Sequence, residues 1–182
     1  FDLAVAPPQV YNVDEAAGLS AFNLMLLADS GYGQGEMLVT PLQLASMFCL
    51  FANGGSIVTP HIVEGMYCTV DGDYTCAMKA EPGFWRENAV DSHIVDTIGV
   101  MLEHVVSRDY NGTGRNLKVT SCTVRGKTGT AEVGFDKSRE ISWFVGFRAG
   151  EHAQSAPRLV LVMLEVPAGD KYSQLKLDVA RE

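Results

Sequence analysis

The sequence has no cluster of basic residues. Its 182 residues include 14 Lys and Arg against 22 Asp and Glu, which gives a formal net charge of −8 at pH 7. Nucleic acids and anionic membrane surfaces attract proteins through patches of positive charge. We therefore expect neither nucleic acid nor an anionic lipid surface among the partners of this chain.

Long apolar runs and metal-ligand spacings are also missing. No stretch reaches the roughly twenty apolar residues that a membrane-spanning helix needs. No two of the 4 Cys residues have the spacing of a zinc site, the 4 His residues are isolated from one another, and the glycines form no phosphate-binding loop. The sequence therefore predicts no metal site and no bound cofactor.

Helix signals and strand signals are both present, which places the chain in the α+β class as one domain or a large subdomain. Within 33–55, Thr40, Pro41 and Gln43 have the pattern of a capping box, and the helix that follows is apolar nearly all round, as a buried helix is. A second long helix is expected over 91–110, starting at Asp91 or Ser92. A short helix at 14–27 and an amphipathic closing helix at 171–182 complete the set.

Three strand signals lie near the end of the chain, at 123–133, 141–148 and 158–166. Their short connections favour an antiparallel meander across 123–166. The segment at 158–166 is apolar on both alternations, so its pattern predicts a central strand that is covered on both faces.

Cys68 and Cys76 flank an Asp-Gly turn in a plausible hairpin. A three-residue loop at 71–73 would place the two cysteines directly opposite each other, within reach of a cross-strand disulfide. Two interpretations stay open, a disulfide and two free thiols. Cys49 and Cys122 fit buried, inert thiols.

The most informative stretch, at 125–130, reads Arg-Gly-Lys-Thr-Gly-Thr. We call residues 127–130 the box, and the strand that carries them the box strand. A lysine and two threonines beside glycines on a strand edge suit the binding of a carboxylate and the lining of an acyl-transfer site. Upstream lie a Gly-Gln-Gly-Glu loop at 33–36, a Thr-Pro-Leu-Gln-Leu-Ala run at 40–45 and an Ala-Asn-Gly-Gly turn at 52–55. In this order the motifs closely resemble the transpeptidase domain of class B penicillin-binding proteins, members of the serine β-lactamase and D,D-peptidase superfamily.

Two motifs of that family are missing from the sequence. The nucleophile belongs to a Ser-x-x-Lys motif and the second motif is Ser-x-Asn, and both precede the Gly-Gln-Gly-Glu loop in the family. Neither occurs before residue 33 here. The string Ser-Gln-Leu-Lys at 173–176 follows the box, and we interpret it as the exposed start of the closing helix. The resemblance therefore implies that residues 1–182 are the C-terminal part of one transpeptidase domain, without its N-terminal strands and nucleophile helix.

The resemblance also implies roles for the box residues. Lys127 and Thr130 are the expected catalytic residues: the lysine supplies charge to the protonation network of the second motif, and the Thr130 backbone N–H is one donor to the oxyanion. Thr128, Gly129 and Thr130 are expected to bind substrate, the two hydroxyls at its terminal carboxylate and the glycine by leaving room for the acyl carbonyl. Trp143 is expected in the core or packed behind the box strand.

The implied parent is a peptidoglycan D,D-transpeptidase that binds penicillin and cross-links stem peptides through an acyl-serine intermediate. It would be anchored in the bacterial membrane and act at the extracytoplasmic face. Alternative parents are a non-catalytic β-lactam-binding sensor or pseudoenzyme, a β-lactamase and a D,D-carboxypeptidase. The isolated chain is expected to be inactive. Because two further strands of the family would lie beside 158–166, that strand would be an exposed edge here, and the chain is expected to associate through it.

Overall fold

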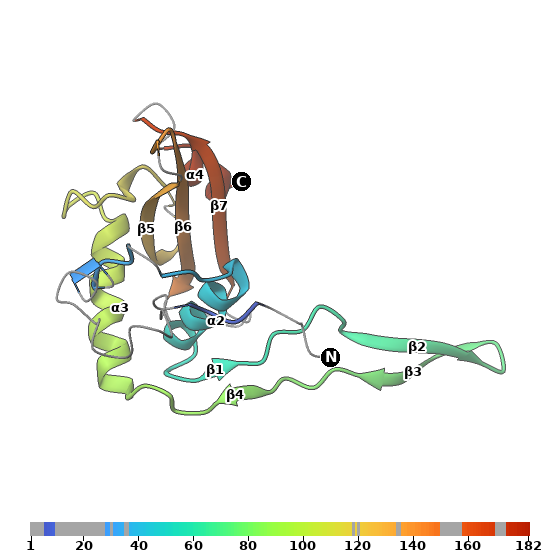
Figure 1. Ribbon diagram of the computed structural model, residues 1–182. Coiled ribbons are helices and arrows are strands. Elements are labelled where there is room, and N and C mark those ends of the chain that lie inside the picture. The colour runs from blue at the N-terminus through green and yellow to red at the C-terminus, as the bar shows by residue number, and fades with distance from the viewer. Residues whose placement is uncertain are drawn as a thin grey trace, which may run out of the picture. The chain divides into compact units, whose positions relative to one another are not determined.

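The computed structural model of the protein describes residues 6–9, 28–29, 31–34, 37–117, 119, 121–133, 136–149, 158–169 and 174–182. The chain divides into one compact unit over Val5–Leu44 and a larger unit that includes Ala45–Glu182. Helices and antiparallel strands occur together, which confirms the α+β class (Figure 1). The elements are α2 (Pro41–Ala52), β1 (Ile57–Val58), β2 (Gly65–Val70), β3 (Asp73–Lys79), β4 (Phe84–Arg86), α3 (Ser92–Val106), the 3-10 helix η2 (Arg115–Leu117), β5 (Thr123–Val133), β6 (Arg139–Ala149), β7 (Leu159–Pro167) and α4 (Leu175–Arg181).

Helix α2 begins with the capping box that the sequence predicts. The backbone N–H of Thr40 donates to the side-chain oxygen of Gln43 at 2.8 Å, and the backbone N–H of Gln43 donates to Thr40 Oγ1 at 3.2 Å. The pair satisfies two backbone groups that a helix start leaves without partners. Phe48 and Leu50 are buried, but Met47 is exposed. The expectation of a fully buried helix is therefore wrong, because the described residues cover only part of its apolar surface.

Helix α3 begins after Asp91, whose side chain accepts a hydrogen bond from the backbone N–H of His93 at 2.9 Å. It ends at Val106, short of the end of the 91–110 range expected from the sequence. The chain turns back at this point, and the N–H of Gly114 donates to a carbonyl in the last helical turn at 2.8 Å. That fold-back leads into η2.

Strands β5, β6 and β7 form one antiparallel sheet in that order, as the sequence predicts (Figure 1). Residues directly opposite each other share a face, and the register places Thr128, Phe144 and Val162 in one row across the sheet. Phe144 and Val162 form a buried core with Leu117 of η2 and Leu177 of α4. Helices η2 and α4 therefore cover the face that carries Thr128.

The ring of Phe144 lies against two glycines. A Cβ atom added to Gly146 would lie 2.8 Å from this ring, and one added to Gly126 would lie 3.0 Å from it. At contacts this short, a side chain at either position would force the ring or the backbone to shift. The glycine just before the box, Gly126, is thus explained by packing.

Helix α3 packs beside β5 through Arg125. A Cβ atom at Gly99 of α3 would meet the Arg125 guanidinium at 2.6 Å, so the glycine makes room for the arginine. Arg125 Nε also lies 3.6 Å from Glu103 Oε2 on the same helix. These contacts fix the strand just before the box.

The hairpin of β2 and β3 turns through two residues, whereas the sequence analysis expected three at 71–73. Val70 lies directly opposite Asp73. The two residues between them have positive φ angles, 54° at Asp71 and 91° at Gly72. Asp-Gly is a preferred pair for a two-residue hairpin turn because both positions need the left-handed region. The longer loop was therefore the wrong prediction.

The shorter turn places the two hairpin cysteines on different faces. Cys68 lies opposite Thr75, and Cys76 lies opposite Tyr67. Neighbouring residues in a strand point to opposite faces, so the two thiols project from opposite sides of the hairpin. The expectation that they face each other is wrong, and of the two interpretations the structure has the free thiols.

Strand β7 is an edge strand. It pairs with β6 on one side, and among the described residues no strand pairs with its other side. Val162 is buried, whereas Val160 is 44% exposed and Met163 is 42% exposed. The prediction of a central strand covered on both faces is thus wrong for these residues. An apolar pattern indicates burial but does not specify which strand lies next to it. The exposed edge that the resemblance implied is present. The helix expected at 14–27 lies outside the described residues.

Candidate active site

The four predicted site residues at 127–130 lie together in the middle of β5. One side of β5 pairs with β6, and on its other side the described part of the chain supplies no pairing strand. An unpaired strand edge presents backbone N–H and C=O groups to whatever lies next to it. The box is therefore placed where an extended ligand can hydrogen-bond to the backbone.

Thr128 points into the covered side of the sheet. It is 9% exposed, and its Oγ1 lies 2.7 Å from Oγ1 of Thr113, in the turn between α3 and η2. Either hydroxyl can be the donor of this hydrogen bond. Sequence reasoning did not identify Thr113 as a partner, because it lies in a segment that has the pattern of an ordinary turn.

Lys127 is exposed, on the opposite alternation from Thr128. Its Nζ donates a hydrogen bond to the carbonyl oxygen of Thr128 at 2.6 Å. The amine is thus held beside the backbone of the box strand. This contact keeps the positive charge next to the segment that carries both threonines.

Gly129 lies directly opposite Trp143 of β6. A Cβ atom at Gly129 would be 3.5 Å from Cβ of Trp143, an ordinary contact distance. The neighbouring strand therefore does not exclude a side chain at Gly129. Trp143 is half-buried and packs beside the box strand, in agreement with one of the two expected placements.

A second lysine reaches the box from α4. Lys176 is only 5% exposed, and its Nζ donates to the carbonyl oxygen of Gly129 at 2.9 Å and lies 3.4 Å from Oγ1 of Thr130. Burial lowers the pKa of Lys176 below its ordinary value; the carboxylate of Glu140 opposes this shift and the charge of Lys127 adds to it. The covered side of the box therefore holds a positive charge as well as the hydroxyl pair of Thr113 and Thr128.

Sequence reasoning interpreted the string at 173–176 as the exposed start of a helix. That interpretation is wrong for Lys176, which faces inward because its neighbour Leu177 is anchored in the core at 1% exposed. Gln174 and Leu175 are exposed, as expected. The only local signal for an inward Lys176 is its position next to an apolar residue in a short helix.

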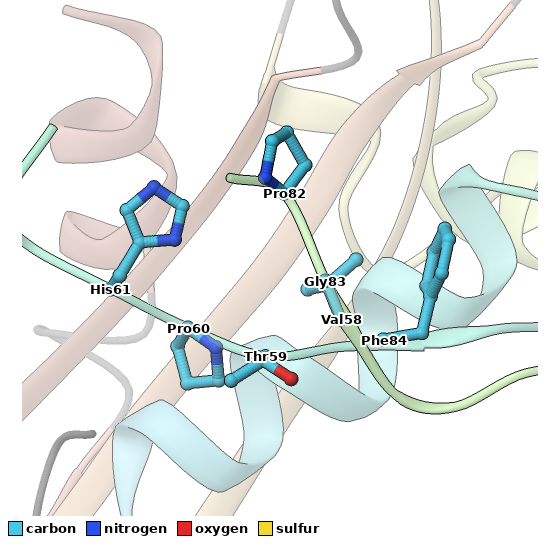
Figure 2. A pocket seen from close by; sticks show the side chains of 7 residues that line it. All are labelled: Val58, Thr59, Pro60, His61, Pro82, Gly83 and Phe84. Carbon is cyan, nitrogen blue, oxygen red and sulfur yellow. The ribbon is translucent and has the colours of Figure 1, made fainter. Parts of the chain in front are cut away.

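A separate cavity has a volume of about 310 Å³. It is lined by the segment that leaves β1 and the segment that enters β4, and Figure 2 shows His61 and Phe84 at its opposite ends. The backbone N–H of Thr59 donates to the carbonyl of Gly83 at 2.9 Å and so joins the two segments. None of the predicted site residues lines this cavity.

No group of three His, Cys, Asp or Glu residues that could hold a metal ion is found in the part of the chain that the structure describes. Within the same residues, none of the helices has the length and apolar character needed to cross a bilayer.

Comparison with known proteins gives a match along most of the chain. The model of the penicillin binding protein transpeptidase domain matches residues 7–178. The chain is 35% identical over 127 residues to penicillin-binding protein 3 of Bacillus subtilis, covering 68% of this chain and 17% of that protein. It is 35% identical over 101 residues to the peptidoglycan D,D-transpeptidase MrdA of Acinetobacter baumannii, covering 56% of this chain and 14% of that protein. The chain thus spans less than a fifth of the length of either relative.

Solved structures show the same fold. Penicillin-binding protein A from M. tuberculosis, in an imipenem acyl-enzyme complex, superposes with a TM-score of 0.69 at 22% identity, covering 98% of this chain and 36% of that one. Penicillin-binding protein 2B from Streptococcus pneumoniae strain R6 gives a TM-score of 0.65 at 20% identity, covering 86% of this chain and 25% of that one. At these identities the likeness establishes the fold.

Proposed function

The chain belongs to the penicillin-binding protein transpeptidase family, and from this premise we propose that it is the C-terminal part of the transpeptidase domain of a peptidoglycan D,D-transpeptidase. The observation that carries the proposal is the box at 127–130, which lies inside the matched region on a strand edge that none of the described strands pairs with. The substrate would lie along this edge as an extended peptide that ends in D-Ala-D-Ala, and a β-lactam would occupy the same place.

The reaction is acyl transfer through a serine ester. A serine outside this chain attacks the carbonyl carbon between the two D-Ala residues, and the negative charge that develops on the carbonyl oxygen is stabilised by the backbone N–H of Thr130. The peptide bond then breaks and the terminal D-Ala leaves with a proton on its amine. The amine of a second stem peptide attacks the ester, which forms the cross-link and releases the serine.

Lys127 and the two threonines have distinct parts in this scheme. The exposed ammonium of Lys127 supplies positive charge at the site edge. The hydroxyls of Thr128 and Thr130 donate hydrogen bonds to the terminal carboxylate. A hydroxyl can donate one hydrogen bond and accept others, so when Thr113 donates to Thr128 across 2.7 Å, the proton of Thr128 is left to bind the carboxylate.

The edge of β7 that no described strand covers fits a domain that continues in a segment outside this chain. Strands supplied by that segment would pair with β7 and cover exposed apolar residues such as Val160 and Met163. Without them the isolated chain would associate through this edge, because an unpaired strand edge is a template for pairing. The parent would be held at the membrane, with this domain at its extracytoplasmic face and stem peptides as its substrates.

The test uses the natural full-length protein that contains this chain. Incubation with a fluorescent penicillin should give a labelled band that survives denaturing electrophoresis, and incubation with a D-Ala-D-Ala stem peptide should release D-Ala and form a cross-linked product. Residues 1–182 produced alone should remain unlabelled. Thr128→Val should weaken acylation because the substrate carboxylate loses a donor, whereas Thr75→Val, at an exposed hairpin position, should acylate like the wild type.

The alternative parents give different products in the same assay. Labelling without release of D-Ala would indicate a sensor or pseudoenzyme, and rapid turnover of the penicillin would indicate a β-lactamase. Release of D-Ala with an uncross-linked peptide as product would indicate a D,D-carboxypeptidase. A wild-type protein that is never labelled would overturn the proposed function.

A further inference from the structure

Lys176 is a buried cation that the proposed mechanism does not use. It comes from α4, which packs against β6, β7 and η2. Its amine extends to the box strand β5, at the opposite edge of the sheet from β7. Charged side chains are rarely buried without a partner, because removing a charge from water is unfavourable. An apolar side chain of similar length would anchor α4 without that penalty, so the contacts that the ammonium makes are the feature to explain.

The shorter of these contacts goes to one particular peptide group. Lys176 Nζ donates to the carbonyl oxygen of Gly129 at 2.9 Å. That carbonyl and the N–H of Thr130 are the two ends of a single planar peptide unit, whose electrons are delocalised over oxygen, carbon and nitrogen. A positive charge at the oxygen therefore draws electron density from the N–H and makes it a stronger hydrogen-bond donor.

The contact is partly buried, which strengthens it. Ser142, directly opposite Thr130 on β6, is 0% exposed, and Leu177, next to Lys176 on α4, is buried in the core. An electrostatic interaction is stronger away from water than at an exposed surface, because less water is present to screen the charges. The charged groups that act on the amine are Lys127 of β5 and Glu140 of β6.

We propose that Lys176 is a positioning residue for acyl transfer, which holds the Gly129–Thr130 peptide and polarises its N–H toward the oxyanion. The assignment rests on the proposed function of the box strand. The longer contact, 3.4 Å to Oγ1 of Thr130, orients the hydroxyl of the same residue. Lys176 thus acts from the covered face of the sheet on a peptide group at the strand edge where the substrate would lie.

The kinetic test compares three variants of the full-length protein. Lys176→Met keeps the length of the side chain and removes its charge, Lys176→Arg keeps the charge, and Lys79→Met is a matched control at an exposed position in β3. Loss of a direct oxyanion donor slows catalysis by about 10²–10³-fold. Lys176→Met loses only the polarisation of that donor, so we expect its limiting acylation rate at saturating penicillin to fall by about tenfold. The concentration that gives half of this rate should stay unchanged.

Lys176→Arg should retain most of the rate, and Lys79→Met all of it. A wild-type limiting rate in Lys176→Met would overturn the proposal. A change in the half-saturating penicillin concentration alone would also overturn it. So would an equally large loss of the limiting rate in Lys176→Arg, provided that thermal unfolding shows this variant to be normally folded.

A second measurement does not depend on acylation. In protein labelled with 15N-threonine, the amide proton of Thr130 should move upfield in Lys176→Met. In the wild type it should move upfield as pH rises through the lowered pKa of Lys176, because the ammonium loses its charge, and this titration should be absent in Lys176→Met. A Thr130 amide that is the same in both proteins would overturn the proposal even if penicillin is bound. If penicillin does not acylate the wild type but the Thr130 amide proton still titrates with Lys176, the proposed function alone would be overturned and the polarisation would be supported.

Discussion

The β5–β6–β7 sheet and the β2–β3 hairpin are both antiparallel, yet they are stabilised in different ways. In the sheet, Phe144 is 2% exposed, and η2 and α4 contribute side chains to the same core. In the hairpin, every residue of β3 and all of β2 except Gly65 is exposed. Its stability comes from its own pairing and turn, with one close ring pair, Tyr67 and Tyr74, whose centroids are 6.4 Å apart.

This contrast shows what backbone pairing does by itself. Two strands without a covering layer bury little apolar surface and are marginally stable. The same pairing becomes rigid where side chains from helices fill one face of a sheet. The residues assigned to chemistry lie on the covered sheet, which can hold hydrogen-bond donors in fixed positions, and the hairpin carries none of them.

The largest expected effect comes from breaking the sheet core. Phe144→Ala should lower the free energy of unfolding by about 3–5 kcal/mol, because it removes the ring that packs the core. Tyr74→Ala, at a residue that is 84% exposed on the hairpin, should change it by less than about 1 kcal/mol. Urea unfolding followed by tryptophan fluorescence measures both. Similar losses in the two variants would mean that the hairpin is as tightly packed as the sheet.

Lys127→Ala should separate activity from stability within the sheet. In the full-length protein we expect acylation to slow by about a hundredfold, which corresponds to about 2.7 kcal/mol. The unfolding free energy should barely change, because the side chain is exposed. Fluorescent penicillin labelling over time gives the rate, with Lys79→Ala on the hairpin as its control. If Lys127→Ala is acylated at the wild-type rate, the assignment of the active site to this strand is wrong.

Glycine substitutions should distinguish close packing from backbone strain. Gly126→Ala places a Cβ atom 2.9 Å from the Val145 carbonyl oxygen and 3.0 Å from the Phe144 ring, and overpacking of this kind costs about 1–3 kcal/mol. Gly72→Ala meets no atom within 4 Å, but its φ of 91° is unfavourable for alanine by about 1 kcal/mol. In hydrogen exchange, Gly126→Ala should reduce the protection of backbone amides across β5 to β7. Gly72→Ala should reduce it only in the hairpin.

The smallest expected effect concerns the hairpin thiols. Because Cys68 and Cys76 project from opposite faces, reduction should change the unfolding free energy by less than about 0.5 kcal/mol. Each thiol should react with a maleimide in the unreduced protein, and Cys76→Ser should remove one site without altering the other. Loss of about 2 kcal/mol or more on reduction would indicate a disulfide and a different hairpin register.

The sequence was most informative where structure depends on near neighbours. The capping box of Thr40 and Gln43, the start of α3 at Asp91 and the order of the three final strands follow from residues close together in the chain. The box residues at 127–130 lie together in the structure, as four adjacent residues on one strand must, and their assignment as the site stays a prediction.

Features that depend on distant residues were missed. Lys176 contacts Gly129, and Thr113 contacts Thr128, only because the chain folds back over the sheet. The register of the hairpin was missed for a different reason, since one residue more or less in the turn moves every later side chain to the other face. The neighbour of β7 could not be inferred from its apolar pattern either, because both an edge strand and a central strand can carry it.

The Phe144 ring, which lies against Gly126 and Gly146, links the evolutionary histories of positions 144 and 146. A mutation that adds a methyl group at Gly146 meets the ring at 2.8 Å, so it should persist only in lineages where position 144 has already lost its ring. At Gly126 the carbonyl oxygen of Val145, 2.9 Å from an added Cβ atom, would still oppose a side chain after the ring is lost. Across homologues we therefore expect 144 and 146 to change together, whereas 126 should stay glycine whichever residue is present at 144.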